Sequence, residues 1–187
     1  MNLILASQSP RRRELLGLFK MPFTVKAADI DEAMDEGLSA AEEVARVSRM
    51  KADAIDAGDG DVVIAADTIV VLEGHILGKP ADEADAVRML SALSGKAHQV
   101  MTGVTVRRGS RRLTHTEITD IHFRELSGQE IEDYVRTGEP MDKAGAYGIQ
   151  GGAALFADKM HGDYYNVMGL PVCALYLMLR QIMEDTQ

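Results

Sequence analysis

Hydrophobic and polar positions near the start of the chain change from a strand pattern to a helix pattern. The apolar run at residues 3–6 (LILA) predicts a buried strand. Ser9 followed by Pro10 is typical of a helix start, because serine caps the first turn and proline fits the first helical position. Leu15 and Leu16 then form the apolar side of the helix. We therefore expect a strand, a short loop and a helix in succession.

Two capping boxes predict further helices. In each, a serine is followed three residues later by a glutamate, and the two helices start at Ser39 and Ser127. We expect the first of these helices to end at Ala57, before Gly58, and the second to end near Gly138.

Apolar runs and turn residues predict the remaining strands. The run VVIAAD at residues 62–67 is typical of a central strand that is buried on both faces. Hairpins are expected around residues 73–74, around residues 109–110 and around residues 161–162. An apolar helix is expected from Pro171 to Met183.

Together these elements predict an α/β fold. A second short strand is expected at residues 23–28, and Asp82 is expected to cap a helix that closes at residues 94–95. Strands and helices alternate early and hairpins come late, which indicates a mixed α/β sheet. We expect a single domain over residues 1–187.

Composition restricts the class of ligand. The formal net charge is -9 and the isoelectric point is near 5.0, so broad binding to nucleic acid or to a membrane surface is not expected. Any anion must therefore be bound by a local basic pocket.

The single cysteine and the N-terminal sequence bear on location. Cys173 has no partner for an intramolecular disulfide, and we expect it to be a small buried side chain in the C-terminal helix rather than a reactive thiol. The N-terminus lacks a secretory pattern, and the longest apolar stretch, residues 167–179, is too short to span a membrane. We expect a cytoplasmic protein.

A basic cluster follows the first strand. In ASQSPRRREL, residues 6–15, the predicted helix start carries Ser9 and three consecutive arginines. A helix N-terminus binds phosphate through its unpaired N–H groups, and Arg11 and Arg12 add charged donors that match phosphate oxygens. The alternative is a capped surface helix whose arginines pair with nearby glutamates.

Carboxylates mark two further segments. Asp67 comes at the end of the apolar strand, where open α/β sheets bind ligands; the alternative is that it caps a turn through Thr68. The acidic run DIDEAMDE fails the calcium-loop pattern because Met34 stands where glycine is needed. It is either a solvated loop or a source of oxygen ligands for a hard metal ion such as magnesium.

Lysines and a glycine-rich segment complete the candidates. Lys51 and Lys79, taken alone, are read as ordinary surface lysines. The segment AGAYGIQGGAA would let its backbone approach a flat ligand, and the Gln150 amide offers the donor and acceptor needed to read a base edge. A flexible connection is the alternative.

Seven segments, in this order along the chain, resemble the motifs of the Maf family of nucleoside triphosphate pyrophosphatases. They are ASQSPRRRELL, DIDE, AADTIVV, GKP, LSGKAHQVMTGV, DKAGAYGIQG and NVMGLP, and they run from residue 6 to about residue 171. The form DKAGAYGIQG resembles the branch that acts on dTTP and UTP. The resemblance implies cleavage between the α and β phosphates, with Mg²⁺ or Mn²⁺, and modified pyrimidine triphosphates as further substrates.

The resemblance also implies structure and residue roles. The expected fold is that of inosine triphosphatases, an elongated mixed sheet with flanking helices and two lobes around a cleft, in a homodimer. Asp67 matches the catalytic carboxylate, and we expect it to hold the metal with Glu32 and to orient or deprotonate the attacking water. Phosphate-side positions are matched by Ser9, Arg12, Lys51 and Lys79, and positions associated with substrate choice by Arg11, Thr68 and Gln150.

Two other functions compete with this one. A nucleotide-sensing regulator of septum formation would need the arginines and the glycine-rich segment but has no use for the acidic pair Glu32 and Asp67. Nucleic-acid binding through residues 11–13 is disfavoured by the net charge and by the aromatic content of 5%.

Overall fold

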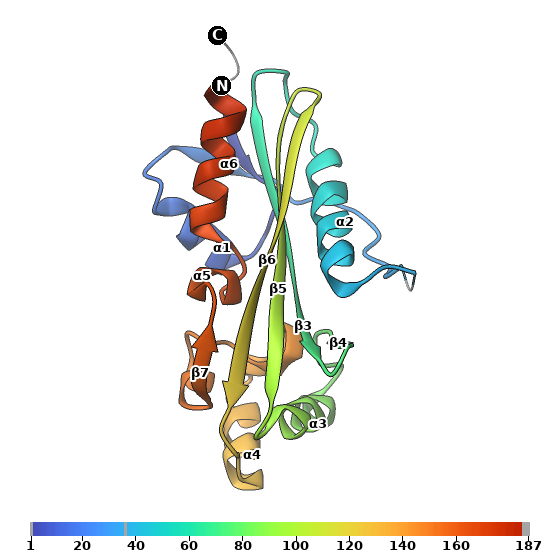
Figure 1. The fold of residues 1–187 in the computed structure, drawn as a ribbon, viewed down its shortest axis with the longest axis vertical. Coiled ribbons are helices and arrows are strands. Elements are labelled where there is room, and N and C mark those ends of the chain that lie inside the picture. The colour runs from blue at the N-terminus through green and yellow to red at the C-terminus, as the bar shows by residue number, and fades with distance from the viewer. Residues whose placement is uncertain (1, 36, 185–187) are drawn as a thin grey trace. The chain divides into compact units, whose positions relative to one another are not determined.

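The computed structural model describes residues 2–35 and 37–184, and its elements are shown in Figure 1. The strands are β1 (Leu3–Leu5), β2 (Phe23–Val25), β3 (Val62–Leu72), β4 (His75–Leu77), β5 (Ala97–Arg108), β6 (Arg111–Phe123) and β7 (Ala157–His161). The α-helices are α1 (Pro10–Gly17), α2 (Ala40–Asp53), α3 (Glu83–Leu93), α4 (Gly128–Arg136), α5 (Tyr164–Val167) and α6 (Val172–Glu184). Three short 3₁₀ helices are η1 (Glu139–Asp142), η2 (Ala144–Ala146) and η3 (Gly152–Leu155).

One mixed sheet runs through the described residues. Its seven strands have the order β2-β1-β3-β5-β6-β7, with β4 paired to β3. Strand β1 is parallel to both β2 and β3, whereas β4 and β7 are antiparallel to their partners. The predicted mixed α/β class is confirmed.

The chain forms two compact units. Of the described residues, the first unit comprises 2–35, 37–67, 102–117 and 169–184, and the second comprises 68–101 and 118–168. Strands β3, β5 and β6 each contribute to both units. Each unit has its own cluster of buried apolar side chains, around Ile4 and Val63 in the first and around Leu90 and Phe123 in the second.

The predicted helix starts are confirmed. The side chains of Ser9, Ser39, Asp82 and Ser127 each accept a hydrogen bond from the backbone N–H three residues later. The capping box is complete at both serines for which it was predicted. These caps satisfy N–H groups that the first turn of a helix leaves unpaired. Because cap and helix are adjacent in the chain, the sequence indicates where each helix starts.

Helix α2 is shorter than predicted, because it ends at Asp53 and not at Ala57. The side chain of Arg107 binds the last carbonyl groups, with Nε 3.1 Å from the Ala52 oxygen and Nη2 2.7 Å from the Ile55 oxygen. A distant arginine thus replaces the next turn of the helix, and Ile55 is buried in the core of the first unit.

The predicted last hairpin is wrong. Strand β7 forms and pairs with β6, but the chain beyond it enters α5 instead of a second strand. Asp163 causes the change, since its carboxylate accepts a hydrogen bond from the Tyr165 N–H and caps the helix. The buried Asn166 amide then binds the Val100 carbonyl and the Thr119 hydroxyl, which fixes α5 within the second unit.

The expectation that Cys173 is buried is also wrong. It lies in α6 as predicted, but it is exposed. The buried stripe of α6 consists of Leu175, Met178, Leu179 and Ile182, and Cys173 falls on the opposite side of the helix.

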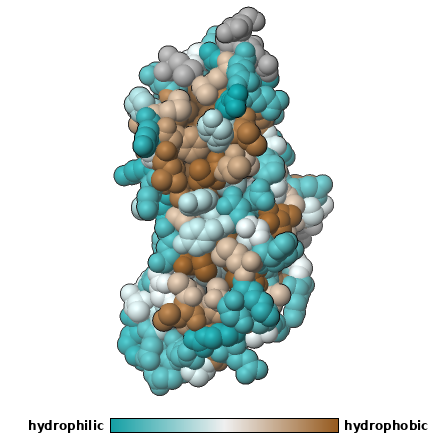
Figure 2. Space-filling model, turned by 60° about the vertical axis from the view of Figure 1, so that its left-hand side comes forward, coloured by the Kyte–Doolittle hydropathy of each residue, from teal (hydrophilic) through white to brown (hydrophobic). Residues whose placement is uncertain are grey.

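Apolar side chains are exposed on α6 and at the end of α1. Leu18, Tyr176 and Leu177 are 55%, 51% and 59% exposed. Figure 2 shows hydrophobic surface on the side of the molecule that carries α6. Among the described residues, no helix is long and apolar enough to cross a membrane.

Candidate active site

The first unit gathers its polar side chains at the carboxyl ends of three parallel strands. In the sheet, Leu5 of β1 lies opposite Val25 of β2 and Ile64 of β3. The segments that continue beyond these positions carry Ser9, the acidic loop of residues 29–35, and Asp67. Because parallel strands end at the same edge of a sheet, these side chains lie at one edge although they are far apart in the sequence.

Lys51 joins the two carboxylates expected to act together. Its ammonium Nζ is 2.8 Å from Oδ1 of Asp67 and 3.0 Å from Oε1 of Glu32. The side chains of Lys51 and Asp67 are only 11% and 16% exposed, whereas Glu32 is 55% exposed. A pair this sheltered interacts more strongly than a surface salt bridge.

The packing of α2 explains why Lys51 reaches Asp67. Lys51 stands seven residues after Val44, on the same side of the helix, and Val44 is fully buried against the sheet. A Cβ atom added to Gly103 of β5 would lie 2.2 Å from the Val44 carbonyl oxygen. Only glycine permits this close approach of helix to strand.

Arg12 connects α1 with the segment that precedes α6. Its Nε donates to the Gly169 carbonyl at 2.8 Å, and its Nη1 lies 3.4 Å from the Ser7 hydroxyl. Burial lowers the pKa of the Arg12 guanidinium, while the charges of Asp67 and Glu32 oppose that change. Arg12 therefore belongs to the same electrostatic cluster as the acidic pair, on the helix that Ser9 caps.

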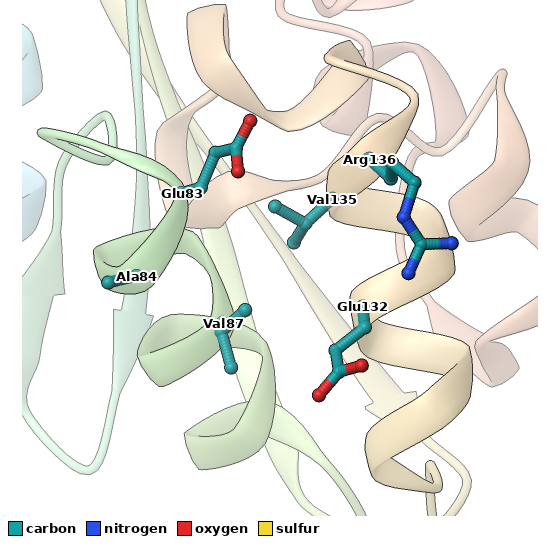
Figure 3. A pocket seen from close by; sticks show the side chains of 6 residues that line it. All are labelled: Glu83, Ala84, Val87, Glu132, Val135 and Arg136. Carbon is teal, nitrogen blue, oxygen red and sulfur yellow. The ribbon is translucent and has the colours of Figure 1, made fainter.

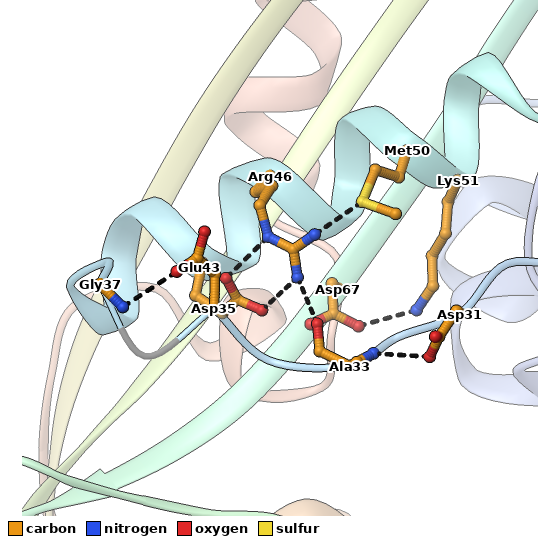
Figure 4. Close-up of polar contacts among 9 residues, drawn as sticks. All are labelled: Asp31, Ala33, Asp35, Gly37, Glu43, Arg46, Met50, Lys51 and Asp67. Atoms are coloured by element: carbon orange, nitrogen blue, oxygen red, sulfur yellow. Dashed lines mark hydrogen bonds and ion pairs between the residues drawn. The ribbon is translucent and has the colours of Figure 1, made fainter.

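The acidic loop is tied to α2 by Arg46 (Figure 4). The Arg46 Nη2 donates to the Ala33 carbonyl at 2.7 Å, and the same guanidinium forms a bidentate pair with Glu43 at 2.6 and 2.9 Å. Glu43 is itself buried, so the arginine is held in one position. Since Ala33 follows Glu32 directly, this contact fixes the loop next to the Lys51 ammonium.

The remaining predicted site residues lie on α1 and in the second unit. Arg11 is half-buried on α1, and Arg13 is exposed. Thr68, Lys79 and Gln150 belong to the second unit; Thr68 is half-buried in β3, and the other two are exposed. The structure thus brings together Ser9, Arg12, Glu32, Lys51 and Asp67 within the first unit.

Within the second unit, the Lys79 turn and the glycine-rich segment are in contact. The Gly145 N–H donates to the Gly78 carbonyl at 2.9 Å. Gly145 has φ +68°, and an added Cβ would lie 2.8 Å from the Val70 side chain. The two motifs therefore share one support, although 65 residues separate Lys79 from Ala144 in the sequence.

The glycine-rich segment is well packed, so its reading as a flexible connection is wrong. Tyr147 is buried, and its hydroxyl forms a 2.8 Å hydrogen bond with Nε2 of His98. Its ring packs edge-on against Phe123, with centroids 4.8 Å apart. Burial lowers the pKa of His98 to about 4, so the imidazole is neutral at physiological pH.

The glycines of this segment approach protein atoms as well. A Cβ added to Gly151 would lie 2.0 Å from Oε1 of Glu139, and one added to Gly148 would lie 3.1 Å from the same atom. The sequence suggested that these glycines admit a flat ligand. In the structure, these positions require glycine for another reason, because a larger residue would crowd the Glu139 side chain.

The donor set of the first unit fits a hard divalent ion. Glu32 and Asp67 direct carboxylate oxygens to one cation, the Lys51 ammonium. Magnesium is commonly held by one or two carboxylates together with substrate phosphates and waters. In residues 2–35 and 37–184, no cluster of three or more His, Cys, Asp and Glu side chains is placed to hold a metal alone. The two carboxylates fit a hard divalent ion such as Mg²⁺ or Mn²⁺.

A separate hollow lies between α3 and α4 of the second unit (Figure 3). It is lined by Glu83, Ala84, Val87, Glu132, Val135 and Arg136. Two carboxylates on its border outnumber the single guanidinium, so the hollow is unsuited to a polyphosphate. It contains none of the predicted site residues.

Comparison with known proteins decides the family. The model of the Maf-like protein family matches residues 2–182. The chain belongs to the Maf family. The resemblance of the seven motifs is thereby confirmed.

Two curated relatives of this Maf chain are named dTTP/UTP pyrophosphatase. A dTTP/UTP pyrophosphatase from Symbiobacterium thermophilum is 52% identical over 180 residues, covering 96% of this chain and 93% of the relative. A protein of the same name from Bacillus pumilus is 50% identical over 171 residues, covering 91% and 90%.

Solved structures support the fold of this Maf chain. A HAM1 protein from Coxiella burnetii matches with a TM-score of 0.52 and 15% identity, covering 97% of this chain and 99% of its own. The Staphylococcus aureus Ham1 protein matches equally, with a TM-score of 0.52, 15% identity and complete coverage of both chains. At this identity the likeness concerns the fold alone.

Three residues of this Maf chain that hold predicted site segments in place were not predicted from the sequence. Arg46, Tyr134 and Glu139 lie in ordinary amphipathic or polar surroundings, and each acts through backbone groups of a distant loop. No local spacing signals such a contact. The one available clue was the glycine content of residues 148–152, which signals a close neighbour without naming it.

Proposed function

We propose that this protein is a metal-dependent nucleoside triphosphate pyrophosphatase that converts dTTP and UTP to the monophosphate and pyrophosphate. Modified pyrimidine triphosphates are included among the substrates. The single observation that carries the proposal is the cluster of Asp67, Lys51 and Glu32 beside Arg12, at the carboxyl ends of parallel strands. The names of the curated relatives support the choice of substrates.

The reaction joins water to the α-phosphorus and breaks its bond to the oxygen that bridges to the β-phosphorus. Asp67 is the group proposed to orient the water and accept its proton. Glu32 and Asp67 would hold the metal ion, which when bound supplies positive charge for the phosphates and lowers the pKa of water. The sheltered position of Asp67 favours this role, because a charge excluded from water acts more strongly on its neighbours.

Cationic side chains are proposed to bind the triphosphate. Lys51 and Arg12 are positioned in the first unit to neutralise charge that develops on the departing pyrophosphate. Ser9 and Arg11 belong to the capped start of α1, where N–H groups suit phosphate oxygens. This local positive site lets a protein of net charge -9 bind a polyanion.

Substrate choice is proposed to rest on residues of the second unit. Gln150 is exposed and its amide provides both a donor and an acceptor for a base edge. Lys79 is proposed to bind phosphate, and Thr68 and Arg11 to contribute to selection. Because dTTP and UTP differ only by a methyl and a hydroxyl group, one pocket separates them by about 1–3 kcal/mol.

Three further features belong to the proposal. The two units are proposed to make up one functional domain over residues 1–187, acting in the cytoplasm as a homodimer. The exposed apolar side chains of Leu18, Tyr176 and Leu177 support self-association. Light scattering of the purified protein tests the dimer directly, and a monomer mass at micromolar concentration would contradict it.

The test of the activity is pyrophosphate release from a panel of nucleoside triphosphates. The panel contains dTTP, UTP, CTP, dATP, GTP and 7-methyl-GTP, each with magnesium, manganese or no metal. Metal-dependent release from dTTP and UTP above the others is expected. Silence across the panel would favour the regulator function instead.

A further inference from the structure

The glycine-rich segment presents Gln150 at the tip of a tight turn. The Gly151 N–H donates to the Gly148 carbonyl at 3.0 Å, which closes a four-residue turn with Ile149 and Gln150 at its centre. Ile149 is buried and Gln150 is exposed. The turn therefore has a fixed inner side, and the Gln150 side chain projects from the outer side.

Two side chains outside the motif hold both ends of this turn. The Gly148 N–H donates to the Tyr134 hydroxyl at 3.0 Å, and that hydroxyl donates to Oε1 of Glu139 at 2.9 Å. At the other end, the Gly152 N–H donates to Oε2 of Glu139 at 3.1 Å. The Glu139 carboxylate thus holds both ends of the turn. It binds Gly152 directly and Gly148 through the Tyr134 hydroxyl.

The network is rigid because its members are themselves fixed. Tyr134 is 5% exposed, and its ring packs edge-on against Phe156 with centroids 5.1 Å apart. Burial raises the pKa of the Tyr134 phenol, and the Glu139 carboxylate adds to the rise, so the hydroxyl remains a donor. Glu139 begins η1, and its own carbonyl accepts a hydrogen bond from the Lys143 ammonium at 3.0 Å.

The glycines of the turn lie close to the side chains that hold it. An added Cβ would approach Glu139 at Gly148 and Gly151, and at Gly152 it would lie 3.1 Å from the Tyr134 ring. Glu139 and Tyr134 thus explain the glycines at 151 and 152, and at Gly148 the Lys143 side chain, 3.0 Å from the added Cβ, is as close as Glu139.

We infer that Tyr134 and Glu139 are positioning residues for substrate selection, because they fix the turn from which Gln150 reads the base. The inference rests on the proposed function. Neither residue touches the substrate in this account, and both act through Gln150. Their loss therefore changes the preference among bases more than the rate of phosphate chemistry.

The first variant is Tyr134→Phe, which removes the hydroxyl and keeps the ring. We expect kcat with dTTP to be largely retained, KM to rise, and the preference for dTTP over CTP to fall by about tenfold, as expected for a lost hydrogen-bonded support. Glu139→Gln is the second variant. Tyr134 and Gly152 donate to different oxygens of the carboxylate, and the NH₂ group that replaces one of these oxygens cannot accept a hydrogen bond, so the same result is expected. Tyr165→Phe, at an exposed tyrosine of the same unit, is the matched control and is expected to leave the preference unchanged.

A double-mutant cycle separates positioning from general damage. If Tyr134 acts through Gln150, then Tyr134→Phe in a Gln150→Ala background causes no further loss of preference. An equal fall in kcat/KM for all bases, or full additivity with Gln150→Ala, would overturn the inference. So would loss of the fold in both single variants, since the network would then serve stability alone. Absence of pyrophosphate release by the wild-type protein would overturn the proposed function, and this inference with it.

Discussion

The Lys51 ammonium lies between the carboxylates of Asp67 and Glu32, 2.8 Å from the first and 3.0 Å from the second. The family resemblance implies that Lys51 binds the phosphates and that the two carboxylates hold a metal. The structure shows that the three groups form one cluster. Lys51 therefore both stabilises the acidic pair and provides positive charge next to it.

Replacing Lys51 with methionine tests this double role. The substitution leaves two neighbouring carboxylates without their shared cation, so the site repels a triphosphate. We expect kcat/KM for dTTP to fall by at least about 100-fold, the range found when one preorganised electrostatic donor of an active site is removed. Thermal unfolding is expected at a lower temperature as well, because the sheltered Asp67 carboxylate loses the cation with which it is paired. Lys159→Met, at an exposed lysine of β7, is the control, and an equal effect of both variants would contradict the role.

Arg46 is expected to set the position of Glu32. Arg46→Gln removes the contact to the Ala33 carbonyl and frees the acidic loop. Because Glu32 is a proposed metal ligand, we expect a higher Mg²⁺ concentration for half-maximal activity and a fall in kcat/KM of about tenfold. The measurement is a magnesium titration of pyrophosphate release.

A matched control exists for Arg46. Arg136 forms the same kind of pair with an acidic residue three positions earlier, but on the surface of α4. Arg136→Gln is expected to leave the magnesium titration unchanged. If Arg46→Gln also leaves it unchanged, the loop does not depend on this contact.

Gly103 is expected to be intolerant of any side chain. Gly103→Ala places a Cβ 2.2 Å from the Val44 carbonyl oxygen, so α2 must move away from β5. We expect a loss of about 3 kcal/mol or more in the free energy of unfolding, as for overpacked cores. Urea denaturation measures this loss. Gly128→Ala, at the start of α4 with no atom within 4 Å of the new Cβ, should have no destabilising effect.

His98 predicts a pH dependence of stability. Its pKa is about 4 in the folded protein and 6.5 in its ordinary state, so between these values the unfolded chain binds more protons. Stability is therefore complete above pH 6.5 and falls by about 3 kcal/mol as the pH drops to 4. His98→Gln should lose this component in urea unfolding curves recorded across that range, whereas exposed His75→Gln should keep it. Identical pH profiles of wild type and His98→Gln would contradict the assignment.

Local signals made most of the fold predictable. The caps at Ser9, Ser39, Asp82 and Ser127 satisfy N–H groups within a few residues, so the sequence carries them directly. The turn at Glu73–Gly74 has φ values of +51° and +83°, the conformation expected for its hairpin. Features that depend on distant residues were missed, such as the end of α2 at the Arg107 side chain.

The site was predictable in its members but only partly in its geometry. Asp67 and Ser9 could be placed at one edge because parallel strands end together. The acidic loop gave no hint that Arg46 would hold it, since that hydrogen bond goes to a backbone carbonyl. Likewise, the sequence assigned the glycines near Gln150 to a ligand, and the structure places them against Glu139.

The most direct test of the account is the product formed from dTTP by the wild-type protein and by Asp67→Asn. This substitution keeps the size of the side chain and removes its charge. The account predicts equimolar thymidine monophosphate and pyrophosphate from the wild-type protein with magnesium, and a loss of at least about 1000-fold in the variant, as for the removal of a central catalytic group. Release of orthophosphate instead of pyrophosphate, or near-normal turnover by Asp67→Asn, would contradict it.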